Sequence, residues 1–488
     1  MDLSKSKYCN ALQCKKMLWL EKNKPNEKKE LKNNNVFENG NTTHEVARYL
    51  FGEHINIEYD ENLQEMINNT ISTIESYQNI IITEASFNYN NNFCSVDILK
   101  KDNNKYEIYE VKSSTKLKDI YIKDISYQYY ILTNLGLNVT KCSIIYINNK
   151  YIRDESINLE ELFTINNVTK EVKELQEEVE NNIIEINNYM KQTNEPKEDI
   201  DIKCFKPYPC QFFDYCKKHL QENNVFNISN MHISNKIKLY KQGKYDYESL
   251  LKENIDKKYK QQIEYELYNK EQYIDTYKIK EFINTLTYPL YFLDFETFQM
   301  PIPLYKGTSP YEQIPFQYSL HYIKKDNSKL NHLEFLSEPG IDPRRPLAER
   351  LVKDIPSNAC ILAYNMSFEK TIIKKLANTY PDLKDNLMIL HDNIKDLMIP
   401  FKNRYYYDKN MKGSYSIKYV LPAIFPNEPS LDYHNLDLIH NGEEAMNNYA
   451  NLETLSKEEQ KYIKERLLRY CELDTYAMVK IYQKLKKI

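Results

Sequence analysis

The sequence predicts an α/β protein of two domains that are joined by helices. Its 488 residues exceed the size at which a single hydrophobic core usually stops growing, so two cores are expected. Residues 41–136 follow the order helix, strand, strand, helix, with alternating apolar residues in SFNYNNNFCSVDIL and KYEIYEVKSS around the turn KKDNNK. A second α/β unit begins at TYPLYFLDFETF, whose unbroken apolar run is typical of a buried strand.

The remaining segments are mostly helical in pattern. Residues 166–192 are acidic and helix-patterned, and residues 230–285 are expected to form amphipathic helices. The second unit continues through ILAYNMSFEKTIIKKLA and ends in a long helix over EEQKYIKERLLRYCELDTYAMVKIYQKL. We therefore predict an N-terminal domain over 1–225, a helical connector over 226–285 and a C-terminal domain over 286–488.

Charge and composition narrow the function classes. The net charge of −4 excludes a uniformly basic nucleic-acid binder, although a local patch would serve a groove. Residues 1–35 hold nine lysines against four acidic residues, which is either such a patch or a solvated surface. Because the chain has neither a secretory signal nor an apolar run of about 18 residues, we expect a cytoplasmic protein outside membranes. In that reducing compartment, clustered cysteines point to metal or reactivity rather than to disulfides.

A first candidate site combines two carboxylates with a lysine. Asp97 is expected near the end of one strand and Glu110 and Lys112 on the next, where a period of two puts the latter pair on one face. Two carboxylates can hold a divalent cation while an ammonium orients or helps to deprotonate an attacking water. Ordinary solvated strand residues show the same pattern. His44 and Gln128 lie where helical residues could face the same cleft.

These motifs resemble those of the RecB-like branch of the PD-(D/E)XK nucleases, over residues 8–217. The resemblance implies a restriction-endonuclease-like fold with Mg²⁺ or Mn²⁺ at its site. The family carries a Gln-x-x-x-Tyr motif on a later helix, where this chain keeps Gln128 but has Leu132 in place of the tyrosine. By resemblance, the metal ligands are His44, Asp97 and Glu110, and the catalytic lysine is Lys112.

Three cysteines follow the first α/β unit with even spacing. Cys204, Cys210 and Cys216 form C-x5-C-x5-C, whereas zinc sites generally use tighter pairs, so structural zinc is the less natural interpretation. Cys14 is the preferred fourth ligand because apolar residues follow it, and Cys9 is its rival. A link from Cys14 to Cys204 would clamp the two ends of the domain together. Unligated thiols are the alternative.

The segments CKKMLWL and CFKPYPCQFFDYC are similar to the cysteine motifs with which RecB-like nucleases hold an iron-sulfur cluster. The resemblance implies a 4Fe–4S cluster that stabilises the fold, with Cys14, Cys204, Cys210 and Cys216 as its ligands. The other cysteines lie in apolar surroundings and are expected to be buried core thiols: Cys94, Cys142, Cys360 and Cys471.

A second candidate site begins with Asp294 and Glu296, two residues apart at the end of the buried-looking strand. Their side chains project to one face, and two neighbouring carboxylates repel unless a cation lies between them, which predicts a metal ion. His321 and His391 are expected to be structural or surface residues. Two further pairs are four residues apart and would share a helical face: Asn365 with Glu369, and Tyr470 with Asp474.

The ordered combination resembles the tyrosine-bearing DEDD exonucleases of ribonuclease H-like fold, over residues 288–487. It implies 3′-to-5′ trimming with two Mg²⁺ or Mn²⁺ ions, although Glu369 stands where the family usually has aspartate. DLMIPFKNRYYY and KGSYSIKYVLPAIF could stack on bases and contact phosphates, or equally form a Tyr-rich packing surface. By resemblance, the metal ligands are Asp294, Glu296, Glu369 and Asp474, Tyr470 orients water, and Asn365 supports the site.

The whole arrangement resembles a bacterial family in which these two nuclease domains are fused. It predicts a metal-dependent deoxyribonuclease that acts on single-stranded DNA or DNA ends in repair, recombination or defence, with a helicase or similar protein as a possible partner. An RNA-trimming exonuclease is one alternative. Another is a nucleic-acid-binding scaffold whose catalytic sites have decayed. Glu369 in place of an aspartate and Leu132 in place of a tyrosine slightly favour this alternative.

Overall fold

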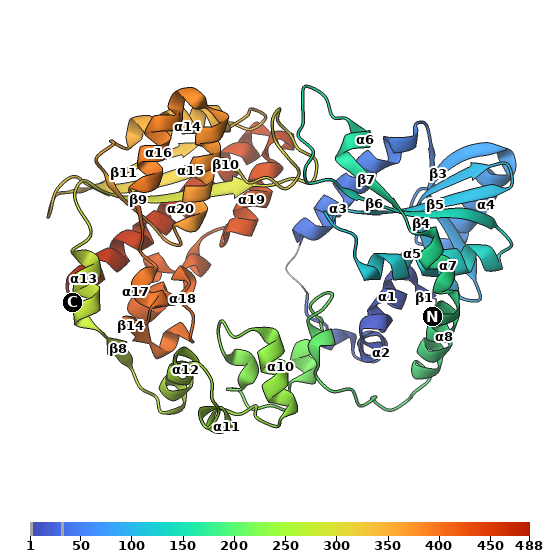
Figure 1. The fold of residues 1–488 in the computed structure, drawn as a ribbon, viewed down its shortest axis with the longest axis horizontal. Coiled ribbons are helices and arrows are strands. Elements are labelled where there is room, and N and C mark those ends of the chain that lie inside the picture. Colours follow the sequence, from blue (N-terminus) through green and yellow to red (C-terminus); the bar gives the residue numbers. More distant parts are fainter. Residues whose placement is uncertain (1–2, 31–33) are drawn as a thin grey trace. The chain divides into compact units, whose positions relative to one another are not determined.

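The computed structural model describes residues 3–30 and 34–488, except for the side chains of 34–39 and 434. Part of the lysine-rich stretch 1–35 therefore lies outside the described residues. The chain divides into two compact units (Figure 1): Met1–Leu220 with Met300–Tyr311, and Gln221–Gln299 with Glu312–Ile488. Both combine helices with a sheet, which confirms the α/β class.

The first unit is built on a seven-stranded mixed sheet of order β2-β3-β4-β5-β6-β7, with β1 pairing in parallel with the start of β4. Strand β4 is antiparallel to both β3 and β5, whereas β2 is parallel to β3 and β5 is parallel to β6. Its strands are β1 Leu3–Ser4, β2 Ile55–Asn56, β3 Asn79–Tyr89, β4 Asn92–Asp102, β5 Lys105–Lys112, β6 Asn138–Ile147 and β7 Phe163–Asn167. Its helices are α1 Lys5–Gln13, α2 Lys15–Asn23, α3 Asn34–Ala47, α4 Leu63–Ser76, α5 Asp119–Asn134, α6 Leu159–Leu162, α7 Thr169–Glu174, α8 Gln176–Tyr189 and α9 Phe213–Cys216.

The predicted order of elements over 41–136 lacked β2, α4 and β3. SFNYNNNFCSVDIL does not form one strand, because Asn90 and Asn91 adopt left-handed φ values of 49° and 61° and turn the chain between β3 and β4. Asparagine tolerates this conformation better than most residues. Asp97 consequently lies in the middle of β4 rather than near the end of a strand.

The second unit contains a five-stranded sheet of order β11-β10-β9-β12-β13, in which β9 is antiparallel to β10 and parallel to β12. A separate two-stranded sheet joins β8 to β14. Its strands are β8 Gln272–Ile274, β9 Leu290–Phe298, β10 Ile314–Ile323, β11 Leu330–Leu336, β12 Cys360–Ala363, β13 Ile394–Asp396 and β14 Tyr406–Asp408. Its helices are α10 Ile233–Lys241, α11 Tyr247–Leu251, α12 Lys257–Leu267, α13 Thr276–Ile283, α14 Arg344–Asp354, α15 Ser367–Thr379, α16 Lys384–Asp392, α17 Ile399–Lys402, α18 Ile417–Ile424, α19 Gly442–Ala450 and α20 Lys457–Lys486.

The central strand β9 is covered on both faces, as its apolar run predicted. Tyr291, Leu293 and Phe295 join the core under α14, α15 and α16, which lie together on one side of the sheet (Figure 1). Because side chains alternate along a strand, Asp294 and Glu296 project to the other face, against which α20 packs.

The connector belongs to the second unit. Gln262 of α12 accepts a hydrogen bond from the Ser229 amide (3.0 Å), and the Ser229 hydroxyl donates to the Lys412 carbonyl (2.6 Å). Gly413, with φ of 73°, lies against the Gln262 side chain, where a Cβ would approach the amide oxygen to 2.0 Å. These contacts tie the connector to the C-terminal half of the chain.

Residues Met300–Tyr311 belong to the first unit, although the sequence-based boundary assigned them to the C-terminal domain. The Gly307 amide donates to the Arg153 carbonyl (2.8 Å), and the Arg153 amide donates to the Thr308 carbonyl (3.0 Å). Ile302 joins the hydrophobic core beneath β5 and β6. An excursion of twelve residues from the second half of the chain thus completes the first unit.

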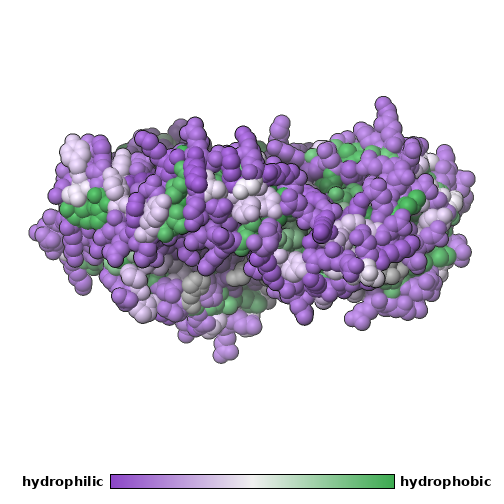
Figure 2. Space-filling model, turned by 90° about the horizontal axis from the view of Figure 1, so that it is seen from below, coloured by the Kyte–Doolittle hydropathy of each residue, from purple (hydrophilic) through white to green (hydrophobic). Residues whose placement is uncertain are grey.

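Figure 2 shows one face of the molecule. On the face drawn in Figure 2, hydrophilic side chains dominate and hydrophobic ones lie in small separate patches. Within the part of the chain that the structure describes, no helix has both the length and the apolar character needed to cross a membrane.

Candidate functional site

The N-terminal carboxylate site lies where β4 and β5 meet α1 and α5. Asp97 and Glu110 are almost completely buried, with 4% and 1% of their surface exposed. Asp97 accepts a hydrogen bond from the Val111 amide (2.7 Å), which fixes its carboxylate against β5. Lys112 contacts Glu110 Oε1 at 2.5 Å, so these two residues project from the same face of β5, as predicted.

Two lysines balance the charge of these carboxylates. Lys5, the first residue of α1, lies 2.9 Å from Asp97 and 3.1 Å from Glu110. Lys112 also contacts Asp124 of α5 at 2.7 Å. Burial tends to raise the pKa of Glu110, but Lys112 and Lys5 more than offset it, and its pKa falls well below the ordinary value. The site is therefore a network of ion pairs that joins α1 and α5 to strands β4 and β5.

His44 and Glu84 lie on the other side of Asp97. His44 Nε2 is 4.0 Å from Asp97 Oδ2, and candidate ligand atoms of His44, Glu84 and Asp97 all lie within 4.8 Å of one another. Burial, followed by repulsion from Asp97, raises the pKa of Glu84. Glu84 also has a left-handed φ of 57° in the middle of β3, and such strained backbone is often found at functional sites. This arrangement could accept a divalent cation.

Gln128 of α5 supports the same site. Its amide nitrogen donates to Glu110 (2.7 Å) and to Asp124 (3.2 Å). Its buried Oε1 has no hydrogen-bond partner among the described residues, and an orphaned acceptor of this kind is often explained by a bound water or ion. Leu132, where a tyrosine would fall by resemblance, is fully buried in the core and contributes no polar group.

Four cysteines line one small cavity in the first unit. Cys14 directly precedes α2, and Cys204, Cys210 and Cys216 come after α8. The apolar residues around the four thiols include Met17 and Phe212. Burial, with smaller effects of the neighbouring thiols, raises the pKa of Cys210 to about 12 and that of Cys216 to about 11. Cys9 instead lies near Lys112 and Glu110. We call Cys14, Cys204, Cys210 and Cys216 the cysteine cluster.

The spacing of these sulfurs bears on which group they could bind. Among the described residues, no three members of the cysteine cluster bring their sulfurs within 4.8 Å of one another. The ligands of one tetrahedral zinc ion, at about 2.3 Å from the metal, would lie closer together than that. As placed, the four sulfurs therefore do not form the close set that one tetrahedral ion requires.

The C-terminal carboxylate site gathers four acidic residues from three elements: Asp294 and Glu296 of β9, Glu369 of α15 and Asp474 of α20. Glu296 and Glu369 are buried, with 7% and 2% of their surface exposed. Because β9 and β12 are parallel, with Leu362 paired to Phe292, the chain that leaves β12 passes beside Asp294. The strand ends and α20 thus bring together residues that lie up to 180 positions apart.

These carboxyl groups repel one another. Burial, followed by the charges of Asp474, Glu296 and Glu369, raises the pKa of Asp294 well above its ordinary value. Burial raises the pKa of Glu369 to about 8 and that of Asp474 to about 6. Among the described residues, no basic side chain forms an ion pair with any of these four acids. The N-terminal carboxylate site, in contrast, contains several ion pairs. Bringing four acids together in this way favours a bound cation.

Glu369 occupies its expected place, whereas Asn365 does not. Helix α15 begins at Ser367, and Asn365 precedes it with a left-handed φ of 74°, so the two residues do not share a helical face. The backbone N–H of Asn365 instead donates to the Asp396 carboxylate at the end of β13 (3.0 Å). Glu369 Oε2 is buried and has no hydrogen-bond partner among the described residues, which leaves it available to a ligand.

Polar groups around Asp474 complete the site. Tyr470 lies one helical turn before Asp474 on α20, as predicted, and the Tyr433 hydroxyl donates to Asp474 Oδ1 at 2.6 Å. Lys418 of α18 is the cation whose charge acts on both Glu296 and Asp474. Lys418 is exposed, so it could contact a ligand phosphate from the solvent side.

The aromatic and basic stretch that runs into α18 has two different parts. Tyr406 and Tyr407 are buried, and Arg404 stacks on the Tyr407 ring with 4.2 Å between its guanidinium carbon and the ring centroid. These residues pack within the unit. Tyr419 is 46% exposed and neighbours Lys418, so only this later part could stack on bases.

Sequence reasoning missed Lys5, Asp124 and Glu84 in the first site, and Tyr433 and Lys418 in the second. None of them belongs to a short motif. Lys5 is separated from Asp97 by 92 positions and is one lysine among many. Lys418 lies within the aromatic and basic stretch KGSYSIKYVLPAIF, and Tyr433 lies a few residues beyond it, so only these two had a signal in the sequence.

The comparisons with known proteins give one family model and one relative. A family model described as Domain of unknown function (DUF2779) matches residues 291–416. Over 221 residues, the chain is 28% identical to the uncharacterized protein MG366 of Mycoplasma genitalium; this match covers 42% of the chain. It spans only 33% of that relative's length. No solved structure matches. The chain is therefore similar to a family of unknown function over a segment that contains Asp294, Glu296 and Glu369.

Proposed function

We propose that the chain is a metal-dependent nuclease that hydrolyses phosphodiester bonds. The observation that carries this proposal is the C-terminal carboxylate site, where Asp294, Glu296, Glu369 and Asp474 converge and mutual repulsion helps to raise the pKa of Asp294. The oxygen atoms of these four carboxylates suit hard cations such as Mg²⁺ or Mn²⁺, and the Cys471 sulfur lies close to Asp294 and Glu296. The covered mixed sheet, with two of these acids on its central strand, supports the ribonuclease H-like fold expected from the motifs.

Each residue of this site has a role in the proposed reaction. Divalent ions held by the carboxylates would polarise the scissile phosphate and favour deprotonation of the attacking water. Tyr470 is buried next to Asp474, where its hydroxyl can orient a water molecule. Lys418 supplies a positive charge at the exposed rim, where it can hold a phosphate of the substrate.

The N-terminal carboxylate site supports a second nuclease centre of restriction-endonuclease-like type. His44, Asp97 and Glu110 would hold the cation, and Lys112 would place its ammonium where charge develops on the phosphate. Lys5 already neutralises Asp97 and Glu110, so a cation must compete with this ammonium for both carboxylates. Metal binding at this site is therefore expected to be weaker than at the C-terminal carboxylate site.

The proposed substrate is DNA, either single-stranded or with free ends, trimmed from 3′ to 5′ by the C-terminal site. A role in DNA repair, recombination or defence in the cytoplasm, with a helicase or similar partner, would suit two such sites in one chain. RNA is the alternative substrate, because the carboxylate chemistry acts on the phosphate and does not by itself distinguish the sugar.

The test is cleavage of end-labelled single-stranded DNA, double-stranded DNA and matched RNA by the full chain, with Mg²⁺, Mn²⁺ or a chelator. We expect cleavage with either ion and none with the chelator. The double variant Asp294→Asn with Lys112→Ala should lose all cleavage, and each single variant should lose one of two product patterns. If the double variant cleaves as well as the wild type, both site assignments are wrong. Tight DNA binding without cleavage would favour a scaffold, and cleavage of RNA alone would favour RNA trimming.

We further propose that the cysteine cluster binds a structural 4Fe–4S cluster. The four thiols line one cavity, and their sulfurs are spaced too widely for a single tetrahedral ion. The bound group would join Cys14 near the start of the first unit to Cys204 near its end. It would thereby close a loop of about 190 residues and restrict the unfolded chain.

Replacing Cys14 by serine is expected to remove the iron, because this change takes one ligand from the cavity. Cys9→Ser is the matched control, since Cys9 lies near Lys112 and Glu110 and should leave the iron in place. After anaerobic purification, iron and visible absorbance are measured for each protein. Roughly four iron atoms per chain are expected in the wild type and the control. A colourless zinc-containing protein would contradict the assignment.

A further inference from the structure

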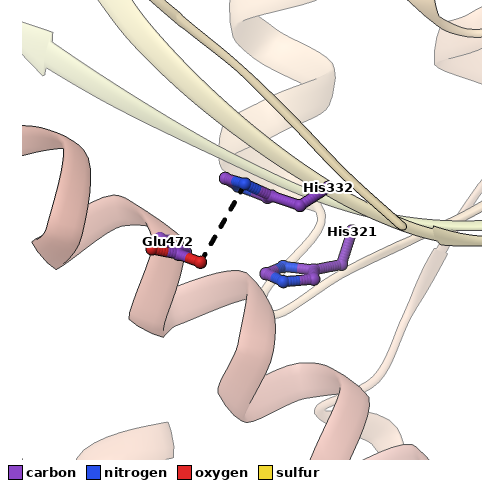
Figure 3. Close-up of side chains that lie close together, drawn as sticks. All are labelled: His321, His332 and Glu472. Carbon is purple, nitrogen blue, oxygen red and sulfur yellow. Dashed lines mark ion pairs between the residues drawn. The ribbon is translucent and has the colours of Figure 1, made fainter. Parts of the chain in front are cut away.

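A group of two histidines and a glutamate lies beside the C-terminal carboxylate site. His321 of β10 and His332 of β11 are paired across the two strands, and Glu472 of α20 approaches them from the facing helix (Figure 3). The imidazole centroids are 4.4 Å apart, and one candidate ligand atom from each residue lies within 4.8 Å of the others. We call His321, His332 and Glu472 the histidine cluster.

Hydroxyl groups hold one nitrogen of each imidazole. His321 Nδ1 lies 2.8 Å from the Thr475 hydroxyl, and His332 Nε2 lies 2.9 Å from the Ser319 hydroxyl. The two hydroxyls are themselves 2.7 Å apart. Outer partners of this kind fix the orientation of metal-ligating histidines and leave the second nitrogen to the metal. Here the second nitrogens are His321 Nε2 and His332 Nδ1.

The remaining spacing suits an ion between the residues. His332 Nδ1 and Glu472 Oε1 are 4.0 Å apart, which is too far for a hydrogen bond. Two ligands of a tetrahedral zinc ion, with bonds of about 2.0–2.1 Å, lie about 3.3 Å apart, so a small movement of the half-exposed Glu472 side chain would let both residues bind one ion. Figure 3 shows both imidazoles and the Glu472 carboxylate facing this space.

The electrostatic environment also suits a cation. Burial, together with the neighbouring His332, lowers the pKa of His321 to about 4, so this ring is neutral and can donate a lone pair at neutral pH. Glu334 of β11 adds a second carboxylate nearby. Burial raises its pKa, the charge of Glu472 raises it further, and His332 lowers it.

We propose that the histidine cluster binds a divalent cation that prefers imidazole ligands, for which Zn²⁺ is the model. Two ring nitrogens and one carboxylate oxygen form a three-ligand set that leaves a position for water or Glu334. Hard cations such as Mg²⁺ prefer carboxylate oxygens, which the C-terminal carboxylate site supplies in greater number. This site is additional to the proposed nuclease centres, and its existence does not depend on them.

An ion here would join α20 to β10 and β11. Glu472 lies between Cys471, whose sulfur is 3.9 Å from Asp294 Oδ2, and Asp474. Ser319, which holds His332, is paired with Asp294 across β9 and β10. Zinc in the histidine cluster would therefore fix the helix that carries Asp474 against the strand next to Asp294.

The test measures zinc binding by the full chain, without nucleic acid. Glu472→Gln and His332→Asn remove ligands at positions that are half and one-quarter exposed, so both variants should fold. His391→Asn, outside the histidine cluster, is the matched control. Bound zinc per chain is counted after equilibrium dialysis, and the melting temperature is recorded with and without Zn²⁺. Co²⁺ spectra separate this site from the thiols, because only thiolate ligands give sulfur-to-metal charge-transfer bands.

We expect the wild type and His391→Asn to bind one more equivalent of zinc than Glu472→Gln and His332→Asn do. At zinc concentrations near one hundred times the dissociation constant, this equivalent should raise the melting temperature of the wild type by roughly 5 °C more than that of either variant. Equal zinc content in all four proteins overturns the proposal, as does zinc bound only with thiolate spectra. Zinc content and melting temperature are measured without a nuclease assay, so a failure of the proposed nuclease function would change neither result.

Discussion

Asp294→Asn is expected to abolish cleavage by the C-terminal site while making the metal-free protein more stable. The change removes a metal ligand, so the rate should fall on the order of 10³-fold. It also removes a buried charge that Asp474, Glu296 and Glu369 repel. We expect the metal-free variant to gain roughly 1–3 kcal/mol of stability at pH 8.

The pH dependence of stability follows from the raised pKa values. The pKa of Glu369 is raised to about 8 and that of Asp474 to about 6, from ordinary values of 4.5 and 3.8. A carboxyl group with a higher pKa in the folded state keeps its proton there after the unfolded chain has lost it. Stability from these groups is therefore present at low pH and is lost as pH rises from about 4 to about 8. Bound Mg²⁺ or Mn²⁺ should reverse the loss.

These expectations are checked by urea unfolding with a chelator at several pH values, alongside the cleavage assay. Asp385→Asn, at an exposed position of α16, is the control and should change neither activity nor stability. If Asp294→Asn loses both activity and stability, its inactivity would come from misfolding, and the repulsion between the four acids would be too weak to matter.

Lys5→Met should have the opposite effect on stability. Asp97 and Glu110 are buried and lose a cation that lies within 3.1 Å of both. Removing one partner from a buried ion pair typically costs about 3–5 kcal/mol, and we expect a loss near the lower end because Lys112 remains. The depressed pKa of Glu110 means that its stabilising effect is present above its ordinary value of 4.5 and is lost as pH falls below it.

Mn²⁺ should restore much of the stability of Lys5→Met, because the cation then takes the place of the ammonium. Calorimetric titration should also show tighter Mn²⁺ binding than in the wild type, since no lysine competes for Asp97 and Glu110. Lys7→Met, on the same helix, is the control and should leave the unfolding free energy within about 0.5 kcal/mol of the wild type. An unchanged stability of Lys5→Met would show that Lys5 does not neutralise the site.

Local patterns in the sequence predicted those parts that depend on local geometry. The apolar run around Asp294 identified β9 as a covered strand, and the spacing of Tyr470 and Asp474 placed both on one face of α20. The cysteine spacing likewise indicated a shared site. In each case a period of two or of 3.6 residues, or a short motif, carries the information within a few positions.

Contacts between distant segments were not predictable in the same way. Lys5 and Glu84 reach the N-terminal carboxylate site through the packing of α1 and β3, and no spacing in the sequence records that packing. Asn365 has the right spacing for a helix, yet its left-handed backbone bonds to Asp396 and delays the start of α15. The pairing of His321 with His332 likewise depends on the register of β10 and β11.

The excursion Met300–Tyr311 also has a consequence for how the protein is made. Translation reaches Tyr311 about 90 residues after Leu220, which corresponds to roughly 5–20 s at ordinary rates of synthesis. During that interval the nascent first unit lacks Ile302 over its core and lacks the Tyr311 hydroxyl that donates to the Ser113 carbonyl, next to Lys112. The ribosome must therefore release β9 of the second unit before the first unit can close, so the two units cannot mature strictly one after the other.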